Sequence, residues 1–184
     1  MSAPSEGARL LHVYVPGAAD RARQSLTHAF VRSLEVPRRS VPTPPDDPGA
    51  YERALLGEWF APGPLLLLEG DKLPTRRTLS DLAECPAALC AQAYLVHPRT
   101  THLPESVWAH RRRTDQGWQW IPEGEPWADL VGFGLVKFGS AVLCLGPSWA
   151  EGTWRDLDTR VSLWTHRLGH VWHVHWPDIP HDHA

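Results

Sequence analysis

Two carboxylates flank a glycine directly after the most apolar run of the chain. Leu65 to Leu68 are four consecutive leucines, and Glu69-Gly70-Asp71 follow them. Ligand sites in open α/β sheets collect at the carboxyl ends of strands, and two carboxylates there are costly to desolvate unless they are paired or bound to a cation. Mg²⁺ or Mn²⁺ bound to diphosphate oxygens suits such ligands. A solvated turn that ends the strand is the plainer interpretation, and the tripeptide alone favours neither.

Histidines form the second group with chemical potential. Six of the eleven lie within residues 166–183. His173 and His175 are two apart in a strand-like segment, so both rings should point to one face, and His181 and His183 repeat the spacing. Imidazole is a frequent ligand of transition metals. Apolar residues alternate with these histidines, which favours packing over a merely solvated tail. We therefore expect at least one of them to have a functional role.

Three cysteines, Cys85, Cys90 and Cys144, are an odd number. No long apolar stretch occurs near the N-terminus, so we expect no secretion signal, no disulfide framework and a reducing cytoplasm. Cys85 and Cys90 lie five positions apart, which is not the CxxC spacing of a zinc knuckle. Burial as small apolar residues is the favoured role, and a zinc site is the weaker alternative.

Two further motifs could serve a ligand. Gly132-Phe133-Gly134 lacks the third glycine of a dinucleotide fingerprint. Its glycines could let the backbone approach a ligand closely, or they could mark a β-bulge. The sequence favours neither interpretation over the other. Asp156 and Asp158 could each act as a general base on a hydroxyl group. Acidic residues also simply favour a first helical turn. Between the two we prefer Asp156.

The elements that must position these residues alternate between strand and helix. Strands are expected at 10–15, 64–68, 91–96 and 171–176, and helices at 20–34, from Asp47 to before Pro62, at 78–84, and from Thr153 to Leu168. Residues 97–126 should form a long excursion with a small hairpin around Trp118 and Trp120. Residues 130–145 should contain a strand, a turn and further apolar structure. The 184 residues fit one α/β layered domain.

Composition argues against two classes of protein, strongly basic nucleic-acid binders and proteins that span a bilayer. The net charge is -3, and the only basic run is His110 to Arg113, so a strongly basic nucleic-acid binder is not indicated. The longest aliphatic run is too short to span a bilayer. Ten tryptophans are unusual; we expect most in the core and some on surfaces where sugars or bases stack.

Five segments together resemble a known group of proteins. In order they are LLLLEGD, TLSDLAECPAALC, GFGLVKFGSAV, WRDLDTRVSLWTHRLGH and HVHWPDIPHDH. They resemble small glycosyltransferase-like proteins of actinobacteria and their phages, which are regarded as GT-A-type. The resemblance covers roughly residues 60 to 184. Glu69-Gly70-Asp71 matches the place of the DxD motif of GT-A enzymes, with Glu at the first acidic position.

The resemblance implies a GT-A-like fold, a Rossmann-like mixed sheet flanked by helices in a single compact domain of residues 1–184. It implies a metal-dependent glycosyltransferase that moves a sugar from a nucleotide-sugar donor to an unknown acceptor. Asp71 would hold Mn²⁺ or Mg²⁺, with His173, His175 or His181 completing the metal shell. Glu69 would lie near the donor's ribose or sugar.

In the same interpretation, Gly132 and Gly134 would bind the donor, and Asp156 would be the base of an inverting enzyme. A retaining enzyme would not need that base, and both remain open. The setting of such proteins makes a modified DNA base one conceivable acceptor, with little support from charge. The alternatives are a small metal-dependent hydrolase and a non-catalytic module that binds carbohydrate or protein.

Overall fold

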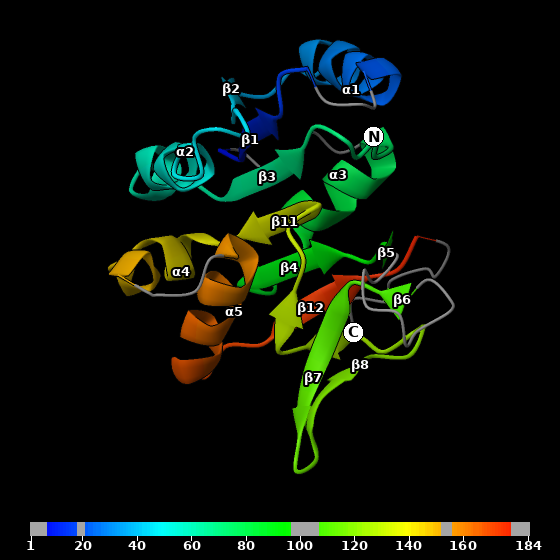
Figure 1. Cartoon of the computed structure of the whole chain (residues 1–184), viewed down its shortest axis with the longest axis vertical. Coiled ribbons are helices and arrows are strands. Elements are labelled where there is room, and N and C mark those ends of the chain that lie inside the picture. The colour runs from blue at the N-terminus through cyan, green and yellow to red at the C-terminus, as the bar shows by residue number, and fades with distance from the viewer. Residues whose placement is uncertain (1–6, 18–20, 97–106, 152–155, 178–184) are drawn as a thin grey trace.

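The chain forms a mixed seven-stranded sheet in a single α/β domain, shown in a computed structural model (Figure 1). The structure describes residues 7–17, 21–96, 107–151 and 156–177. The strand order is β2-β1-β3-β11-β4-β12-β9. Five strands run parallel to one another, and β11 lies antiparallel between β3 and β4. The short edge strand β9 is antiparallel to β12.

The sheet and the accessory strands have these bounds: β1 Arg9–Tyr14, β2 Arg38–Pro42, β3 Leu65–Glu69, β4 Leu89–Gln92, β5 Leu95–Val96, β6 Val107–Trp108, β7 His110–Thr114, β8 Gly117–Trp120, β9 Trp127–Ala128, β10 Leu130–Val131, β11 Leu135–Phe138 and β12 Trp172–His175. The helices are α1 Arg21–Arg32, α2 Ala50–Trp59, α3 Arg76–Glu84, α4 Ser140–Leu143, a 3-10 turn at Ser148–Glu151, and α5 Leu157–Arg167. Strands β10, β7 and β8 form a separate three-stranded sheet, and β5 pairs with β6.

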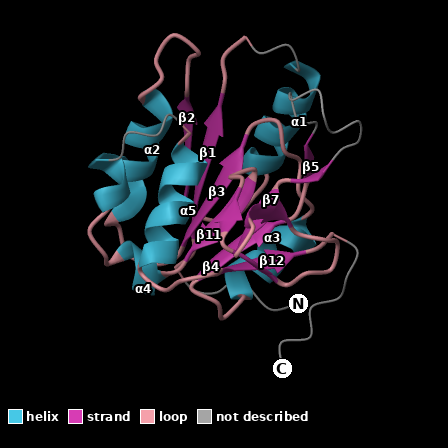
Figure 2. Cartoon of the chain, turned by 60° about the horizontal axis from the view of Figure 1, so that its bottom comes forward, coloured by secondary structure: helices cyan, strands magenta, loops and turns pink. Residues whose placement is uncertain are grey.

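Helices cover both faces of the main sheet. Figure 2 shows α2, α4 and α5 on one face, and α1 and α3 lie on the other. Alternation along the strands divides the core accordingly. Leu65 and Leu67 of β3 pack under α2 and α5, whereas Leu66 and Leu68 pack under α1 and α3. Residues Leu65 to Leu68 are almost fully buried, as expected of a central strand covered on both faces.

Tryptophan supplies much of the core under α2 and α5. Trp59, at the end of α2, is fully buried and packs against the rings of Trp149 and Trp164. Its indole N–H donates to the Leu145 carbonyl at 3.0 Å. Trp172 of β12 is also fully buried. These indoles are structural, as expected for most of the ten.

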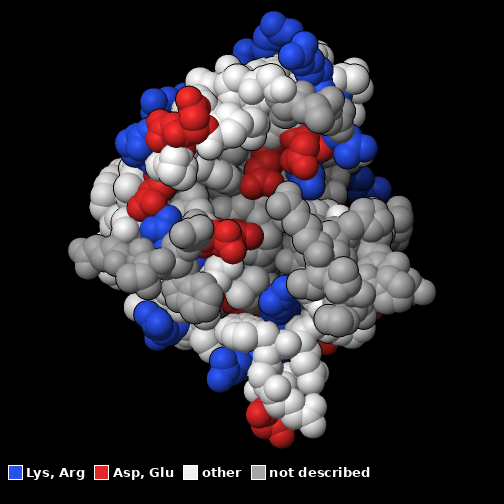
Figure 3. All heavy atoms as spheres, in the orientation of Figure 1, with Lys and Arg blue, Asp and Glu red and all other residues white. Residues whose placement is uncertain are grey.

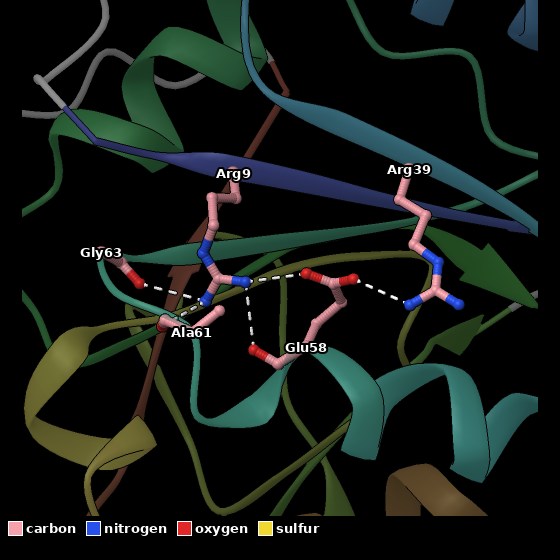
Figure 4. Close-up of polar contacts among 5 residues, drawn as sticks. All are labelled: Arg9, Arg39, Glu58, Ala61 and Gly63. Carbon is pink, nitrogen blue, oxygen red and sulfur yellow. Dashed lines mark hydrogen bonds and ion pairs between the residues drawn. The ribbon is translucent and has the colours of Figure 1, made fainter.

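Arg9 fixes the first strand to the end of α2 (Figure 4). Its guanidinium donates to the Glu58 carboxylate at 2.9 Å and to the carbonyl oxygens of Glu58 and Ala61. Arg39 of β2 contacts the other oxygen of the same carboxylate. A cation at a helix C-terminus interacts favourably with the exposed carbonyls and the helix dipole. This contact orients α2, which carries Tyr51 toward the opposite edge of the sheet.

The expected order of elements is confirmed, with differences at several boundaries. The expected strand at 91–96 is divided into β4 and β5 by Ala93 and Tyr94. The proline-rich stretch of residues 36–48 is loop with a short strand, β2, near its start, and β2 pairs along β1 at the edge of the sheet. The last helix begins after Asp156 rather than at Thr153, and it ends before Gly169, whose φ is +80°. Across the ranges that the structure describes, no helix has the length and apolarity needed to cross a membrane.

Candidate functional site

The parallel strands β1, β3, β4 and β12 end at one edge of the sheet, where the first acidic residue lies. β3 ends at Glu69, whose side chain is directed to the α2 face by the alternation of the strand. The Tyr51 hydroxyl donates to Glu69 Oε1 at 3.0 Å. Burial, and secondly the charge of Asp71, raise the pKa of Glu69 to about 7. A cation that approaches a carboxyl group with a raised pKa stabilises its charged form.

Gly70 and Asp71 continue the chain past the strand into a turn. A Cβ atom on Gly70 would lie 2.8 Å from the Tyr14 Cβ and 3.2 Å from its Cα, so only glycine fits beside the end of β1. Asp71 is half exposed, and Lys72 Nζ donates to its carboxylate at 3.1 Å. The buried Thr27 of α1 donates its hydroxyl proton to the Lys72 carbonyl at 2.9 Å. The turn is therefore held from two sides, with the Asp71 carboxylate accessible.

A cavity of about 330 Å³ opens beside Asp71 at this edge. We call it the smaller cavity. Its lining carries charges of both signs, because the Asp71 carboxylate lies there together with the basic side chains of Arg23 and Lys72. Its lining residues are Arg23, Asp71, Lys72, Leu73, Pro74, Gln92, Tyr94, Gly134 and Leu135. An anion carrying a metal could contact the basic groups and the carboxylate at the same time.

A larger cavity of about 550 Å³ adjoins it, because Tyr94 lines both. The β7–β8 hairpin contributes aromatic and cationic groups, and α5 contributes two carboxylates. Its lining residues are Tyr94, Ala109, Arg111, Trp118, Trp120, Leu130, Gly132, Asp156, Asp158, Thr159 and Leu163. The volume lies within the range of small-molecule sites. Figure 3, in the orientation of Figure 1, shows acidic side chains on different sides of a hollow near the centre of the molecule.

The hairpin holds a cation over an aromatic ring in the larger cavity. The Arg111 guanidinium carbon lies 3.8 Å from the centre of the Trp120 ring, and Arg113 lies over Trp118 at 5.4 Å. The predicted hairpin around these tryptophans is confirmed. The Trp120 ring lies against one side of the Arg111 guanidinium, and this cation–π contact stabilises the charged group. Sugars and nucleobases are ligands that suit such a surface.

Tyr94 explains the two glycines predicted to bind a donor. A Cβ on Gly132 would lie 2.1 Å from the Tyr94 hydroxyl oxygen, and one on Gly134 would lie 2.8 Å from the ring. Gly132 lines the larger cavity and Gly134 the smaller one. Each glycine therefore makes room for the tyrosine that divides the two cavities. The close neighbour of both glycines is thus a side chain of this chain, and binding of a donor by Gly132 and Gly134 stays a prediction.

The two aspartates of α5 differ in environment. Asp156 is exposed at the N-cap position, where its side chain makes no capping hydrogen bond. Asp158 is more buried, and desolvation with the charge of Asp156 raises its pKa. Asp158 also acts electrostatically on Glu69 and Tyr94, so α5 brings it toward the end of β3. Both aspartates line the larger cavity, and Asp158 is the one coupled to the acidic edge.

His173 and His175 lie together with two cysteines. The ligand atoms of Cys85, Cys90, His173 and His175 are all within 4.8 Å of one another, and Asp71 is not among this group. Alternation along β12 places both histidines on the α1 and α3 face, as the sequence predicts, because Trp172 and Val174 occupy the other core. Glu69 faces the opposite side of the sheet. A metal shell shared by Asp71 and these histidines stays a prediction, and His181 lies outside the described residues.

Sequence reasoning missed Tyr51, Tyr94 and Arg111 as members of the site. Each lies far from residues 69–71 in the chain, and no local motif marks it. The one available signal for Arg111 was the basic run beside the expected tryptophan hairpin. The sequence favours Asp156 over Asp158, because the interaction of Asp158 with the end of β3 depends on the packing of α5 on that face.

Comparison with known proteins places the fold only. No protein-family profile matches the chain, and no curated protein matches it. Among solved structures, the crystal structure of A197 from STIV superimposes with a TM-score of 0.57. The superposition covers 91% of this chain and 82% of that chain at 12% sequence identity. At that identity the likeness concerns the arrangement of the mixed sheet and its helices.

Proposed function

We propose that this chain is a metal-dependent glycosyltransferase of GT-A-like architecture that uses a nucleotide-sugar donor. The observation that carries the proposal is the pair Glu69 and Asp71 at the end of a central strand, beside two adjoining cavities. The mixed sheet flanked by helices agrees with the fold that the five sequence segments imply. The acceptor, whether small molecule, lipid-linked sugar, protein or DNA base, is left open.

The smaller cavity is assigned to the metal and the donor's diphosphate. Asp71 offers accessible carboxylate oxygens, which are the ligands that Mg²⁺ and Mn²⁺ prefer. Such an ion, when bound, neutralises charge that develops on the leaving nucleoside diphosphate. Arg23 and Lys72 line the same cavity and would contact phosphate oxygens. Half-buried Glu69 interacts electrostatically with Asp71, and a cation bound at this edge would favour the charged form of its carboxyl group.

The larger cavity is assigned to the transferred sugar and the acceptor. Trp118 and Trp120 offer faces on which a sugar ring can stack, and Arg111 offers donors to hydroxyl groups. A carboxylate on α5 accepts the acceptor's proton if the reaction inverts the anomeric centre. Asp156 is the residue chosen from the sequence, and Asp158, whose pKa is raised by burial, is the second candidate.

A thermal-shift titration tests the donor site. Purified protein is heated with Mn²⁺ and, in turn, UDP, GDP, CMP or dTDP, because a ligand that binds only the native state raises the midpoint. One nucleotide should raise it in a metal-dependent way, and Asp71→Asn should abolish the effect. Asp81→Asn is the matched control, since Asp81 is an exposed carboxylate on α3 whose partner is Arg77. No response to any nucleotide in the wild type would remove the proposal.

Asp156→Asn and Asp158→Asn separate the two base candidates. Once a donor is identified, release of the nucleoside diphosphate is followed against pH. Loss of the acidic limb of the profile in one variant identifies the base, because a general base is inactive when it is protonated. If both variants retain the wild-type rate and profile, neither aspartate is a base, and a retaining reaction gains support.

A further inference from the structure

A second cluster of metal-ligating side chains lies on the other face of the sheet from Glu69. It consists of Cys85, Cys90, His173 and His175, and we call it the Cys/His cluster. Cys90 is completely buried, and Cys85 and His175 are each 3% exposed. The Cys85 sulfur lies 3.2 Å from His173 Nδ1. Within the described ranges it is the only group of three or more such residues whose ligand atoms converge.

The fold builds this cluster from three elements. Strands β4 and β12 are parallel neighbours, and His173 pairs with Cys90 in their register, so the two side chains emerge on the same face. His175 is two residues further along β12 and lies on that face as well. Cys85 is the C-cap residue that directly follows α3, before the loop into β4. Residues 88 positions apart are thus brought into contact at the junction of α3 with the centre of the sheet.

The geometry suits a closed tetrahedral ion. In a zinc site with two sulfur and two nitrogen ligands, bonds of 2.0 to 2.3 Å place the ligand atoms about 3.3 to 3.8 Å apart. The four ligand atoms here already lie within 4.8 Å of one another. A small inward movement of side chains completes the shell. Two thiolates and two imidazoles are a combination that selects zinc over Mg²⁺ or Mn²⁺.

The surroundings support a bound ion with no open position. The His173 ring packs against Trp127 and against His175, with ring centres 4.9 and 4.8 Å apart. The buried Lys137 ammonium donates to the Cys85 carbonyl, which fixes the backbone at the end of α3. Second contacts of this kind orient metal ligands. A site with four protein ligands and little solvent access is of the structural type.

We propose that Cys85, Cys90, His173 and His175 bind one structural Zn²⁺ ion that joins α3, β4 and β12. The ion would be separate from the donor's metal, and the proposal does not depend on transferase activity. It also assigns His173 and His175 to a soft-ligand site, leaving the carboxylate edge to an exchangeable hard cation.

Metal analysis of the full-length, tag-free protein tests the proposal. The protein is produced in zinc-supplemented medium under reducing conditions, desalted, and measured by elemental analysis. We expect one zinc per chain in the wild type and less than a tenth of that in Cys85→Ser/Cys90→Ser. Cys144→Ser is the matched control, because Cys144 is an exposed thiol outside the cluster, and it should retain one zinc.

Two further measurements guard against adventitious binding and misfolding. His181→Ala/His183→Ala should retain the zinc, which distinguishes the cluster from the histidines near the C-terminus. Wild type reconstituted with Co²⁺ should show the visible absorption of tetrahedral cobalt with thiolate ligands, and Asp71→Asn should show the same spectrum. If the double-cysteine variant fails to fold, Cys90→His, which replaces one ligand type by another, should keep the metal and change that spectrum.

Three outcomes would overturn the proposal. The first is wild-type protein with no zinc and two titratable thiols at Cys85 and Cys90. The second is a disulfide between them in protein kept reduced. The third is zinc that stays at full occupancy after both cysteines are replaced, or that is lost only with His181 and His183.

Discussion

The acidic edge and the Cys/His cluster both gather ionisable groups at the sheet, but the edge is open to solvent and the cluster is largely buried. At the edge, Asp71 is half exposed and two cavities open beside it. In the cluster, three of four residues are buried and aromatic rings cover the fourth. An ion that must enter and leave with a ligand needs open coordination positions, whereas an ion that holds elements together needs none. In the two proposals, the acidic edge would bind an exchangeable ion and the Cys/His cluster a structural one.

The largest expected effect is on stability and comes from the cluster. Cys90→Ser should lower the free energy of unfolding by on the order of 5 kcal/mol, because structural zinc contributes its binding energy to folding. Denaturant unfolding with and without a strong chelator measures it, and Cys144→Ser should match wild type. Equal stability of Cys90→Ser and wild type in zinc would show that the cluster carries no ion.

Next comes an effect on activity from the acidic edge. Asp71→Asn should reduce transfer, measured as nucleoside diphosphate released, by about 100-fold or more, since it removes a ligand of the ion that stabilises the leaving group. The unfolding midpoint in the absence of metal should stay within a few degrees of wild type. A large loss of stability instead would mean that Asp71 is structural, and the division between the two regions would fail.

A pH-dependent effect separates the edge from the cluster further. The pKa of Glu69 is raised in the folded protein to about 7 from 4.5, so its contribution to stability is complete below pH 4.5 and is lost as pH rises through 7. Glu69→Gln keeps an oxygen that can accept from Tyr51 and removes the charge. In EDTA, the free energy of unfolding of Glu69→Gln, relative to that of the wild type, should rise by about 3 kcal/mol between pH 4 and pH 8. Denaturant midpoints across that range measure the difference, and a constant difference would contradict it.

The smallest effect concerns the aromatic wall of the larger cavity. Trp120→Ala should weaken binding of the donor or acceptor by about fivefold, roughly 1 kcal/mol, because Arg111 loses its stacking partner and the ligand loses a flat surface. Isothermal titration with the nucleotide identified by thermal shift, or with its sugar conjugate, measures it. Phe60→Ala, at an exposed aromatic away from both cavities, serves as control. An unchanged affinity for both ligands would remove the hairpin from the site.

Local patterns predicted the elements but not what the fold brings together. Four leucines before Glu69 and the strand-like spacing of His173 and His175 indicate a buried strand and a shared face, and both are confirmed. The partners of those histidines could not be predicted, because nothing local shows that β12 pairs with β4. Cys85 and Cys90 lack the CxxC spacing of a zinc knuckle for a physical reason: Cys85 caps the C-terminus of a helix, and Cys90 lies inside a strand. Their convergence depends on sheet order.

The placement of β11 and β12 has a consequence for how the chain acquires its fold. Both strands occupy interior positions of the sheet, although most of the chain precedes them. During synthesis, β3 and β4 must remain unpaired with β11 until residues 135–138 have emerged, and the apolar edge of β3 is exposed in the interval. Non-local pairing of this kind slows folding and leaves strand edges open to other chains. Truncated forms that end before β11 should therefore be captured by chaperones or aggregate, whereas forms that include β12 should not.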